Sequence, residues 1–275
     1  MKIKSTTKTS TMAKDNSKPT IKTEDDLKPS LFKRILWTLF PRHLKCVCCG
    51  QDLPERSEYA FCDNCERELP LNNANVCMRC GVHLDLADRL CLGCKANKSN
   101  YKTARAPLRY IGMVPKLIRG FKYDNKQYLS NVFGRYMLDT YLMENWSIDL
   151  IIPVPLYVKR KKKRGYNQAQ LLAEYMSEKT KIPLLLDNLI RTKDTPTQVK
   201  LTYKQRVANL RGAFSVLDKS QMKSRTVLLI DDVLTTTATA NECSEMLLKA
   251  GAKEVFVLAV ARAEQKVPMQ GNTEE

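Results

Sequence analysis

The stretch that decides the fold is residues 226–261, TVLLIDDVLTTTATANECSEMLLKAGAKEVFVLAVA. It begins with an apolar run without alternation, Thr226–Ile230, as expected of a strand that is covered on both faces of a sheet. In the helix-length segment that follows, apolar residues recur at i, i+3, i+4 and i+7: Cys243, Met246, Leu247 and Ala250. Gly251 marks the expected end of this helix, and residues 254–261 form a second apolar run. A strand, a helix and a strand in this order predict a parallel α/β sheet with a right-handed connection.

Strands and helices also alternate upstream of this stretch, from about residue 100. Residues 148–155, IDLIIPVP, begin with a short run typical of a buried strand. Residues 167–181 have helical periodicity, with Asn167 as the expected N-cap and an apolar face formed by Leu171, Leu172, Tyr175 and Met176. We therefore predict an α/β domain over residues 101–265.

Nine of the ten cysteines lie within residues 46–94. This segment repeats itself: Cys46–Leu53 matches Cys77–Leu84, and each half is followed by a further C-x2-C pair. Thiolates two residues apart can bind one ion from a tight turn, and two such turns complete a tetrahedral shell. The segment therefore predicts two closed, structural zinc sites. One is assigned to Cys46, Cys49, Cys62 and Cys65, and the other to Cys77, Cys80, Cys91 and Cys94.

Alternatives to this assignment stay open at the level of sequence. The cysteine pairs could interleave between the two sites, and Cys48 could replace a neighbouring ligand. A disulfide framework would need an oxidising compartment, of which the chain gives no sign. Iron–sulfur clusters also use four cysteines, although usually in a different spacing. Because the segment is poor in large apolar residues, we expect the metal to supply much of its stability.

The two ends of the chain differ from its middle. Residues 1–30 are rich in Lys, Ser and Thr, and we predict that they form a disordered basic tail. A short amphipathic segment, Leu31–Phe40, is expected to form a docking helix, which assigns residues 31–100 to the zinc module. Residues 266–275 are expected to be a flexible tail. The net charge is +17, no apolar run is long enough to cross a bilayer, and the start lacks a secretory signal. We therefore predict a cytoplasmic protein with polyanionic partners and no membrane insertion.

A candidate binding site follows the first strand of the stretch 226–261. Asp231 and Asp232 come after the apolar run, and a loop then opens the helix: Thr235, Thr236, Thr237, Ala238 and Thr239. Ligands of α/β sheets bind at the carboxyl ends of the strands. The loop amides and the helix N-terminus suit a phosphate, and two carboxylates suit the vicinal hydroxyls of a ribose, directly or around Mg²⁺. These groups predict a ribose 5-phosphate site. In the plainer interpretation, the acids end a strand and Thr239 caps a helix.

Two further stretches carry cations. Residues 159–164, KRKKKR, place six cations in a row between a strand and a helix. In isolation such a run is typical of a solvated, flexible loop. Residues 121–128, FKYDNKQY, interleave aromatic rings with lysines. This pattern suits bases that stack beside a charged groove, and equally a core with lysines outside.

The order of these motifs resembles the ComF (ComFC) family of competence proteins over residues 31–262. The matching parts are the double cysteine ribbon, Phe121–Tyr123, Pro153–Pro155, Arg164–Gln168, Gln198, Leu201, Arg206, Asn209–Phe214 and the acid pair with its loop. The acid pair and loop resemble the phosphoribosyl-pyrophosphate (PRPP) motif of type I phosphoribosyltransferases. The resemblance implies a zinc-ribbon module joined to a type I phosphoribosyltransferase-like domain that acts in natural transformation on imported single-stranded DNA. It also implies Mg²⁺ with PRPP, and a competence helicase and other DNA-uptake proteins as partners.

The resemblance assigns roles to individual residues. Asp231 and Asp232 would bind the ribose hydroxyls and Mg²⁺, and residues 235–239 would bind the 5-phosphate. The basic run lies near the position of the superfamily's pyrophosphate loop, so pyrophosphate or DNA would contact Arg160, Lys161, Lys162, Lys163 and Arg164. Thr237 departs from the family pattern, which has glycine there, and a β-branched residue with positive φ would be strained. Either the loop takes a different shape or phosphate binding is weakened.

Two other functions are compatible with the sequence. A phosphoribosyltransferase that acts on an unidentified base or another acceptor needs little beyond positioning and charge stabilisation, so a missing acid–base pair does not exclude it. An adaptor with an empty pocket is favoured only by Thr237.

Overall fold

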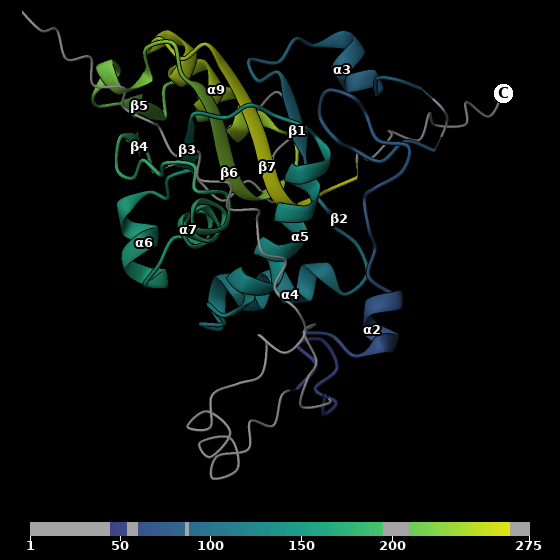
Figure 1. Cartoon of the computed structure of the whole chain (residues 1–275). Coiled ribbons are helices and arrows are strands. Elements are labelled where there is room, and N and C mark those ends of the chain that lie inside the picture. The colour runs from purple at the N-terminus through teal and green to yellow at the C-terminus, as the bar shows by residue number, and fades with distance from the viewer. Residues whose placement is uncertain (1–44, 54–59, 86–87, 195–208, 265–275) are drawn as a thin grey trace, which may run out of the picture. The chain divides into compact units, whose positions relative to one another are not determined.

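The structure is a computed structural model that describes residues 45–53, 60–85, 88–194 and 209–264 (Figure 1). All of these residues belong to one compact unit, Leu44–Glu275. The predicted basic tail, docking helix and C-terminal tail lie outside the described residues, as do the motif residues Gln198, Leu201 and Arg206. Within the described ranges, every helix is too short or too polar to traverse a lipid bilayer.

A five-stranded parallel sheet forms the centre of this unit. Its main strand order is β1-β7-β6-β3, and β2 pairs with β7 beyond the end of β1. The bounds are β1 Thr103–Arg105, β2 Leu108–Arg109, β3 Leu150–Pro153, β6 Thr226–Leu234 and β7 Glu254–Arg262. Pairing between β6 and β7 extends from Thr226 opposite Glu254 to Leu234 opposite Arg262. A separate antiparallel pair is formed by β4 (Leu189–Arg191) and β5 (Phe214–Val216).

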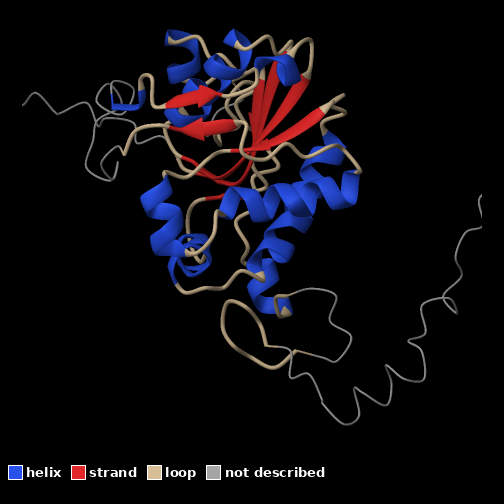
Figure 2. Ribbon diagram, turned by 90° about the vertical axis from the view of Figure 1, so that its left-hand side faces the viewer, coloured by secondary structure: helices blue, strands red, loops and turns tan. Residues whose placement is uncertain are grey.

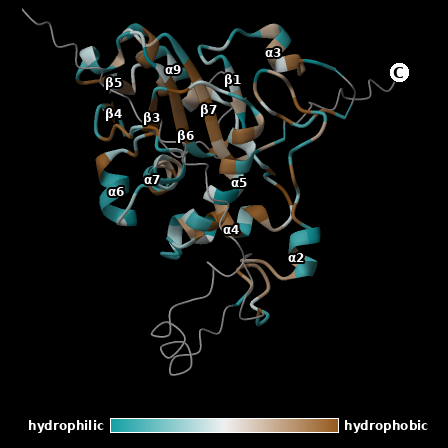
Figure 3. Ribbon diagram, viewed as in Figure 1, coloured by the Kyte–Doolittle hydropathy of each residue, from teal (hydrophilic) through white to brown (hydrophobic). Residues whose placement is uncertain are grey.

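Helices cover both faces of the sheet (Figure 2). Their bounds are α2 Asp63–Arg67, α3 Leu92–Ala96, α4 Val114–Tyr123, α5 Leu129–Met143, α6 Val158–Arg164, α7 Gln168–Thr180 and α9 Ala238–Lys249, and a 3-10 helix spans Lys219–Met222. On one face, Val227 and Leu229 of β6 share a hydrophobic cluster with α9. On the other face, Leu228 and Ile230 pack with α4, α5 and α7. The brown, hydrophobic colour of β6 and β7 in Figure 3 follows from this burial on both sides.

The predicted parallel α/β fold is confirmed, and its elements form close to their expected bounds. The periodic segment 167–181 is α7, and the Asn167 side chain accepts a hydrogen bond from the amide of Ala169 at 3.1 Å, as an N-cap does. The helix expected after the threonine loop is α9, and it ends just before Gly251, whose φ is +104°. One strand is longer than predicted: β6 continues past the acid pair to Leu234, because β7 offers pairing partners along this whole length.

The basic run 159–164 differs from the loop that its composition suggests. It forms most of α6, which ends at Gly165 in a left-handed conformation with φ +84°. Lysine and arginine are good helix formers, and cations in a last turn are favoured by the helix dipole. Glycine adopts the left-handed conformation without strain and so lets the chain turn directly into α7.

Candidate functional site

Eight cysteines converge in two groups of four, and within each group the sulfurs lie within 4.8 Å of one another. The first group is Cys46, Cys49, Cys62 and Cys65, and the second is Cys77, Cys80, Cys91 and Cys94. Each group comes from one half of the repeat, so the halves do not interleave, and Cys48 belongs to neither group. Four thiols at these separations fit the tetrahedral shell of zinc. Because all four ligands are protein residues, both sites are structural zinc sites.

Backbone hydrogen bonds favour the metal-binding thiolate form of one cysteine in each group, Cys46 and Cys77. Burial raises the pKa of Cys46, but backbone hydrogen bonds from Cys49, Cys62 and Cys48 lower it to about 6 overall. In the second group, the amide of Cys91 donates to the sulfur of Cys77 at 3.4 Å. A hydrogen bond to the charged form of a thiol stabilises that form, which is the one that binds a metal.

The two groups pack against different parts of the sheet. Cys46 and Cys65 belong to the hydrophobic cluster that α4 and α5 build on one face. The second group belongs to the cluster on the α9 face, which includes Tyr101, Leu234 and Ala238. The second zinc site therefore packs with the two ends of the threonine loop.

The acid pair lies in β6 near the carboxyl edge of the sheet, and its two carboxylates have different neighbours. Asp232 forms an ion pair with Lys122, with 2.7 Å between Oδ1 and Nζ. Burial, followed by the charge of Asp232, raises the pKa of Asp231 to about 7, and the charges of Lys122 and Arg191 act in the opposite sense. Asp231 therefore exchanges its proton near neutral pH and can accept a cation or a hydroxyl donor after losing it.

Lys122 comes from the motif Phe121–Tyr123 at the end of α4, whose three residues have three environments. Phe121 is fully buried in the core, and Tyr123 is 67% exposed. Between them, Lys122 reaches the acid pair. Burial alone would lower the pKa of Lys122, but the Asp232 charge raises it overall. The sequence identified this motif, but no local pattern in it indicates that Lys122 pairs with Asp232, which lies far away in the sequence.

The motif Arg164–Gln168 forms the turn between α6 and α7, and its side chains contact the end of α4. The Arg164 guanidinium lies 5.0 Å from the centre of the Tyr123 ring and donates to the Gln168 side chain at 2.5 Å. The Tyr166 hydroxyl and the Gln168 amide both donate to the carbonyl of Phe121, at 2.5 and 3.2 Å. These contacts attach α7 to the end of α4 and hold a guanidinium beside the lysine of the acid pair.

The cations of α6 divide between two faces. Arg160 and Arg164 are one helical turn apart and half-buried, whereas the lysines point to solvent: Lys159, Lys161, Lys162 and Lys163. The Nε of Arg160 lies 3.8 Å from Asp194. Burial and then the charge of Arg160 lower the pKa of Arg191, and the charge of Asp231 offsets part of this lowering. The two arginines thus extend the charged site around the acid pair, and the lysines form an outer cationic surface.

Arg191 has no sequence signal that marks it as a site residue. It ends the short strand β4, and its guanidinium lies 5.4 Å from the centre of the Phe214 ring in β5. Its charge acts on Asp231 only because the β4–β5 pair packs near the carboxyl edge of β6.

Thr237 has the conformation that glycine would adopt without strain. Thr237, and not Thr239 as in the plainer interpretation of the sequence, is the N-cap of α9, with φ +60° and ψ 4°. The backbone at Thr237 is therefore left-handed, a conformation that costs a residue with a Cβ about 1–2 kcal/mol of folding free energy. Burial raises the pKa of the Tyr101 hydroxyl, and the Thr237 side chain near it acts in the opposite sense. The first turn of α9 carries no acidic residue, so no carboxylate of that turn competes for its amides.

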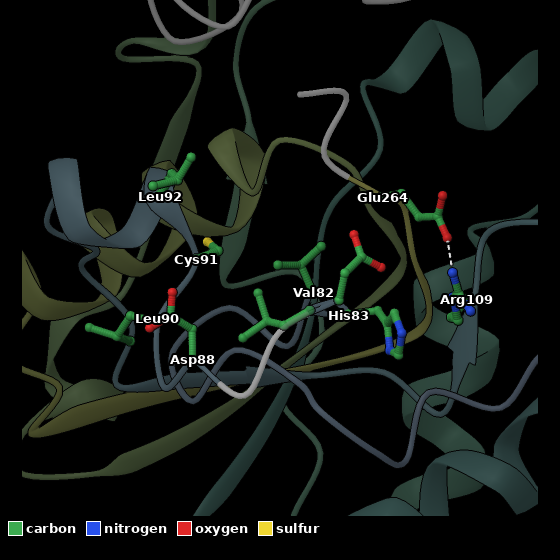
Figure 4. A pocket seen from close by; sticks show the side chains of 10 residues that line it. Val82, His83, Asp88, Leu90, Cys91, Leu92, Arg109 and Glu264 are labelled. Atoms are coloured by element: carbon green, nitrogen blue, oxygen red, sulfur yellow. Dashed lines mark hydrogen bonds and ion pairs between the residues drawn. The ribbon is translucent and has the colours of Figure 1, made fainter. Parts of the chain in front are cut away.

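A pocket of about 270 Å³ lies beside the second zinc site rather than at the acid pair (Figure 4). Its lining includes Val82, His83, Leu90, Cys91, Arg109 and Glu264. Its charged groups are largely paired: Arg109 with Glu264, and Asp88 with Lys95 at 3.0 Å. His83 lies with its Nδ1 3.2 Å from the carbonyl of Ala74. This pocket therefore offers no group that we assign to binding or catalysis.

Comparisons with known proteins agree with the order of these motifs. Residues 35–96 match the family described as double zinc ribbon domain. Over 227 residues, the chain is 33% identical to Competence protein F of Haemophilus influenzae, covering 80% of this chain and 98% of that protein. It is 28% identical to Competence protein ComFC of Bacillus subtilis over 226 residues, which cover 79% and 83% of the two chains. It is also 26% identical to the DNA utilization protein YhgH of Escherichia coli K12 over 209 residues, or 74% and 91% of the two chains.

Solved structures similar to this chain include a PRPP amidotransferase and a phosphoribosyltransferase. One is the glutamine PRPP amidotransferase of B. subtilis, with a TM-score of 0.34, 21% identity and coverage of 51% of this chain and 30% of that chain. The other is adenine phosphoribosyltransferase of Leishmania donovani, with a TM-score of 0.34, 14% identity and coverage of 52% and 68%. The match to Competence protein F extends over nearly the whole of that protein and most of this chain. The chain belongs to the ComF family of competence proteins.

Proposed function

We propose that the chain binds PRPP or a related ribose phosphate at the acid pair and the threonine loop, and serves DNA uptake during natural transformation. The observation that carries this proposal is the arrangement of charge around Asp231 and Asp232. Lys122, Arg164 and Arg191 come from three separate elements, and their charges act on one another or on the acid pair. Such a cluster of cations beside two carboxylates suits a ligand that has both phosphates and vicinal hydroxyls.

Each part of the ligand has a matching group. The acid pair would hold the ribose hydroxyls and Mg²⁺, and the amides and hydroxyls of residues 235–239 would hold the 5-phosphate. The cations at the rim, including Arg160 and Arg164, would contact the pyrophosphate. Bound Mg²⁺ would neutralise part of the phosphate charge. Zinc sites made of reduced cysteines are typical of a reducing compartment, which supports a cytoplasmic location.

The names of the relatives support the biological role. Competence proteins and DNA utilization proteins are similar to this chain over most of its length. We therefore propose that it acts on incoming single-stranded DNA, together with a competence helicase and other DNA-uptake proteins.

Calorimetry with PRPP and Mg²⁺ tests the ligand proposal. We expect wild type to bind, and Asp231→Asn/Asp232→Asn to bind at least tenfold more weakly, since hydrogen bonds to charged groups contribute about 1.5–3 kcal/mol each. Asp139→Asn removes an exposed carboxylate from α5, on the other side of the unit's sheet from α9, and should bind like wild type. No heat from wild type would contradict the proposal and leave an adaptor. Release of pyrophosphate in the presence of a base or DNA would instead identify a transferase.

The outer lysines of α6 are the proposed DNA contact. We expect Lys161→Ala/Lys162→Ala/Lys163→Ala to weaken binding of a single-stranded oligonucleotide and to make the slope of log K against log salt less negative by about 2. These lysines are exposed, so PRPP binding through Arg160 and Arg164 should persist.

A second triple variant, which removes the same number of positive charges elsewhere, provides the control for the DNA experiment. Lys219, Lys223 and Lys253 are exposed and lie near the amino ends of β6 and β7, away from the site. Replacing them with alanine should change the affinity and the salt slope much less. Equal losses for the two triple variants would show that DNA responds to net charge alone, and would remove α6 from the proposal.

A further inference from the structure

Arg262 is a buried arginine that joins the second zinc site to the threonine loop. It is the last residue of β7 and is 2% exposed. On one side, its Nε donates to the carbonyl of Cys80 at 3.0 Å, and its Nη2 lies 3.5 Å from the Cys80 sulfur. On the other side, its Nη1 donates to the carbonyl of Leu234 at 2.9 Å and to that of Thr235. One rigid guanidinium therefore contacts both a zinc ligand and the start of the loop.

The electrostatics of this contact depend on the metal. Four thiolates around one Zn²⁺ carry a net charge of about −2, which a buried guanidinium stabilises. Among the described residues, the hydrogen-bond partners of Arg262 are backbone carbonyls and the Cys80 sulfur, with no carboxylate. When the second site loses zinc, the Cys80 turn is no longer fixed, so the carbonyl and sulfur that hold this guanidinium can move away from it. An arginine left buried without these partners is costly, so the structure around it must rearrange.

A second contact connects the same two regions. Tyr101 is 3% exposed and packs in the hydrophobic cluster that contains the second cysteine group and Ala238 of α9. Its hydroxyl lies near the side chain of Thr237, the residue whose left-handed conformation shapes the loop. Arg262 thus connects the start of the loop to the second zinc site, and Tyr101 packs between that site and the middle of the loop.

We propose that Arg262 is a positioning residue that couples zinc binding at the second site to the shape of the phosphate loop. This inference rests on the proposed ribose phosphate site. Coupling of two binding events is reciprocal, so a ligand that needs the ordered loop strengthens zinc retention at the second site. The first zinc site packs with α4 and α5 on the other face and should not respond.

Cysteine alkylation of the full-length protein tests the coupling. A chelator and an alkylating reagent are added together, and mass spectrometry follows modification of the two cysteine groups separately. With PRPP and Mg²⁺ bound, we expect alkylation of Cys77, Cys80, Cys91 and Cys94 to slow about fivefold or more, and alkylation of the first group to stay unchanged. Arg262→Lys keeps the positive charge but loses the planar guanidinium and its several donors. In this variant, PRPP should no longer slow alkylation of the second group. Equal slowing of both groups, or slowing that persists in the variant, overturns the proposal.

Hydrogen exchange tests the same contact without any ligand. In Arg262→Lys, and in wild type after zinc is removed from the second site, amides of residues 234–241 should exchange faster while those of residues 227–230 in β6 stay protected. Unchanged exchange in the loop overturns the proposal. Equal loss of protection in β6 also overturns it, because the zinc would then hold the whole sheet rather than the loop. Since this measurement needs no PRPP, it separates failure of the coupling from failure of the proposed ligand.

Discussion

Replacing Cys94 with serine is expected to reduce the bound zinc from two ions per chain to one and to lower the free energy of unfolding by several kcal/mol. A structural zinc site contributes on the order of 10 kcal/mol in small zinc modules, and the second site here is also part of the core. Its turns attach directly to the sheet: Arg79 donates to the carbonyl of Cys94 at 2.9 Å, and the amide of Ala104 in β1 donates to the carbonyl of Arg79 at 2.8 Å.

The control for this variant is the neighbouring cysteine that binds no metal. Cys48 lies outside both groups of four, so Cys48→Ser should keep both zinc ions and nearly all of the stability. Elemental analysis of the purified proteins gives the zinc content, and urea denaturation gives the free energy of unfolding. Two zinc ions in Cys94→Ser, or one in Cys48→Ser, would show that the ligand assignment is wrong.

Replacing Gly81 with alanine is expected to destabilise the protein by roughly 2–4 kcal/mol. Gly81 has φ +65°, and a Cβ built on it would lie 2.6 Å from the carbonyl oxygen of Ala104 and 3.3 Å from the Cα of Arg105. Both of these atoms belong to the backbone of β1, which cannot move without breaking its pairing with β7. The close approach is how the second zinc turn packs against the edge of the sheet.

The repeat supplies a matched control for this substitution. Gly50 follows Cys49 as Gly81 follows Cys80, and it has φ +79°, but a Cβ there would have no atom within 4 Å. Gly50→Ala should therefore cost only the backbone strain, about 1 kcal/mol. Urea denaturation of the two variants measures the difference. If both lose the same stability, then the contact with β1 contributes nothing and positive φ explains the whole effect.

The sequence of the threonine loop leaves two possibilities, because Thr237 stands where the family has glycine: a changed loop shape or weakened phosphate binding. The structure keeps the left-handed backbone at Thr237, because the loop is held from both sides by Arg262 and by the start of α9. A strained conformation persists when surrounding contacts determine it in this way. The effect of that strain on phosphate binding stays a prediction.

Local spacing in the sequence was sufficient for the strands around residues 226–261, the N-cap of α7, the end of α9 and the eight zinc-binding cysteines, although it left the division of these cysteines between two sites open. Each of these depends on residues a few positions apart, so periodicity or a short motif reveals it. The ion pair of Lys122 with Asp232, the place of Arg191 and the contact of Arg262 with Cys80 depend on the tertiary structure. Cys80 and Arg262 are 182 positions apart. Nothing in the local pattern of an isolated cation distinguishes it from a solvated one. Only the position of β7 between β1 and β6 in the sheet brings this guanidinium to its partners.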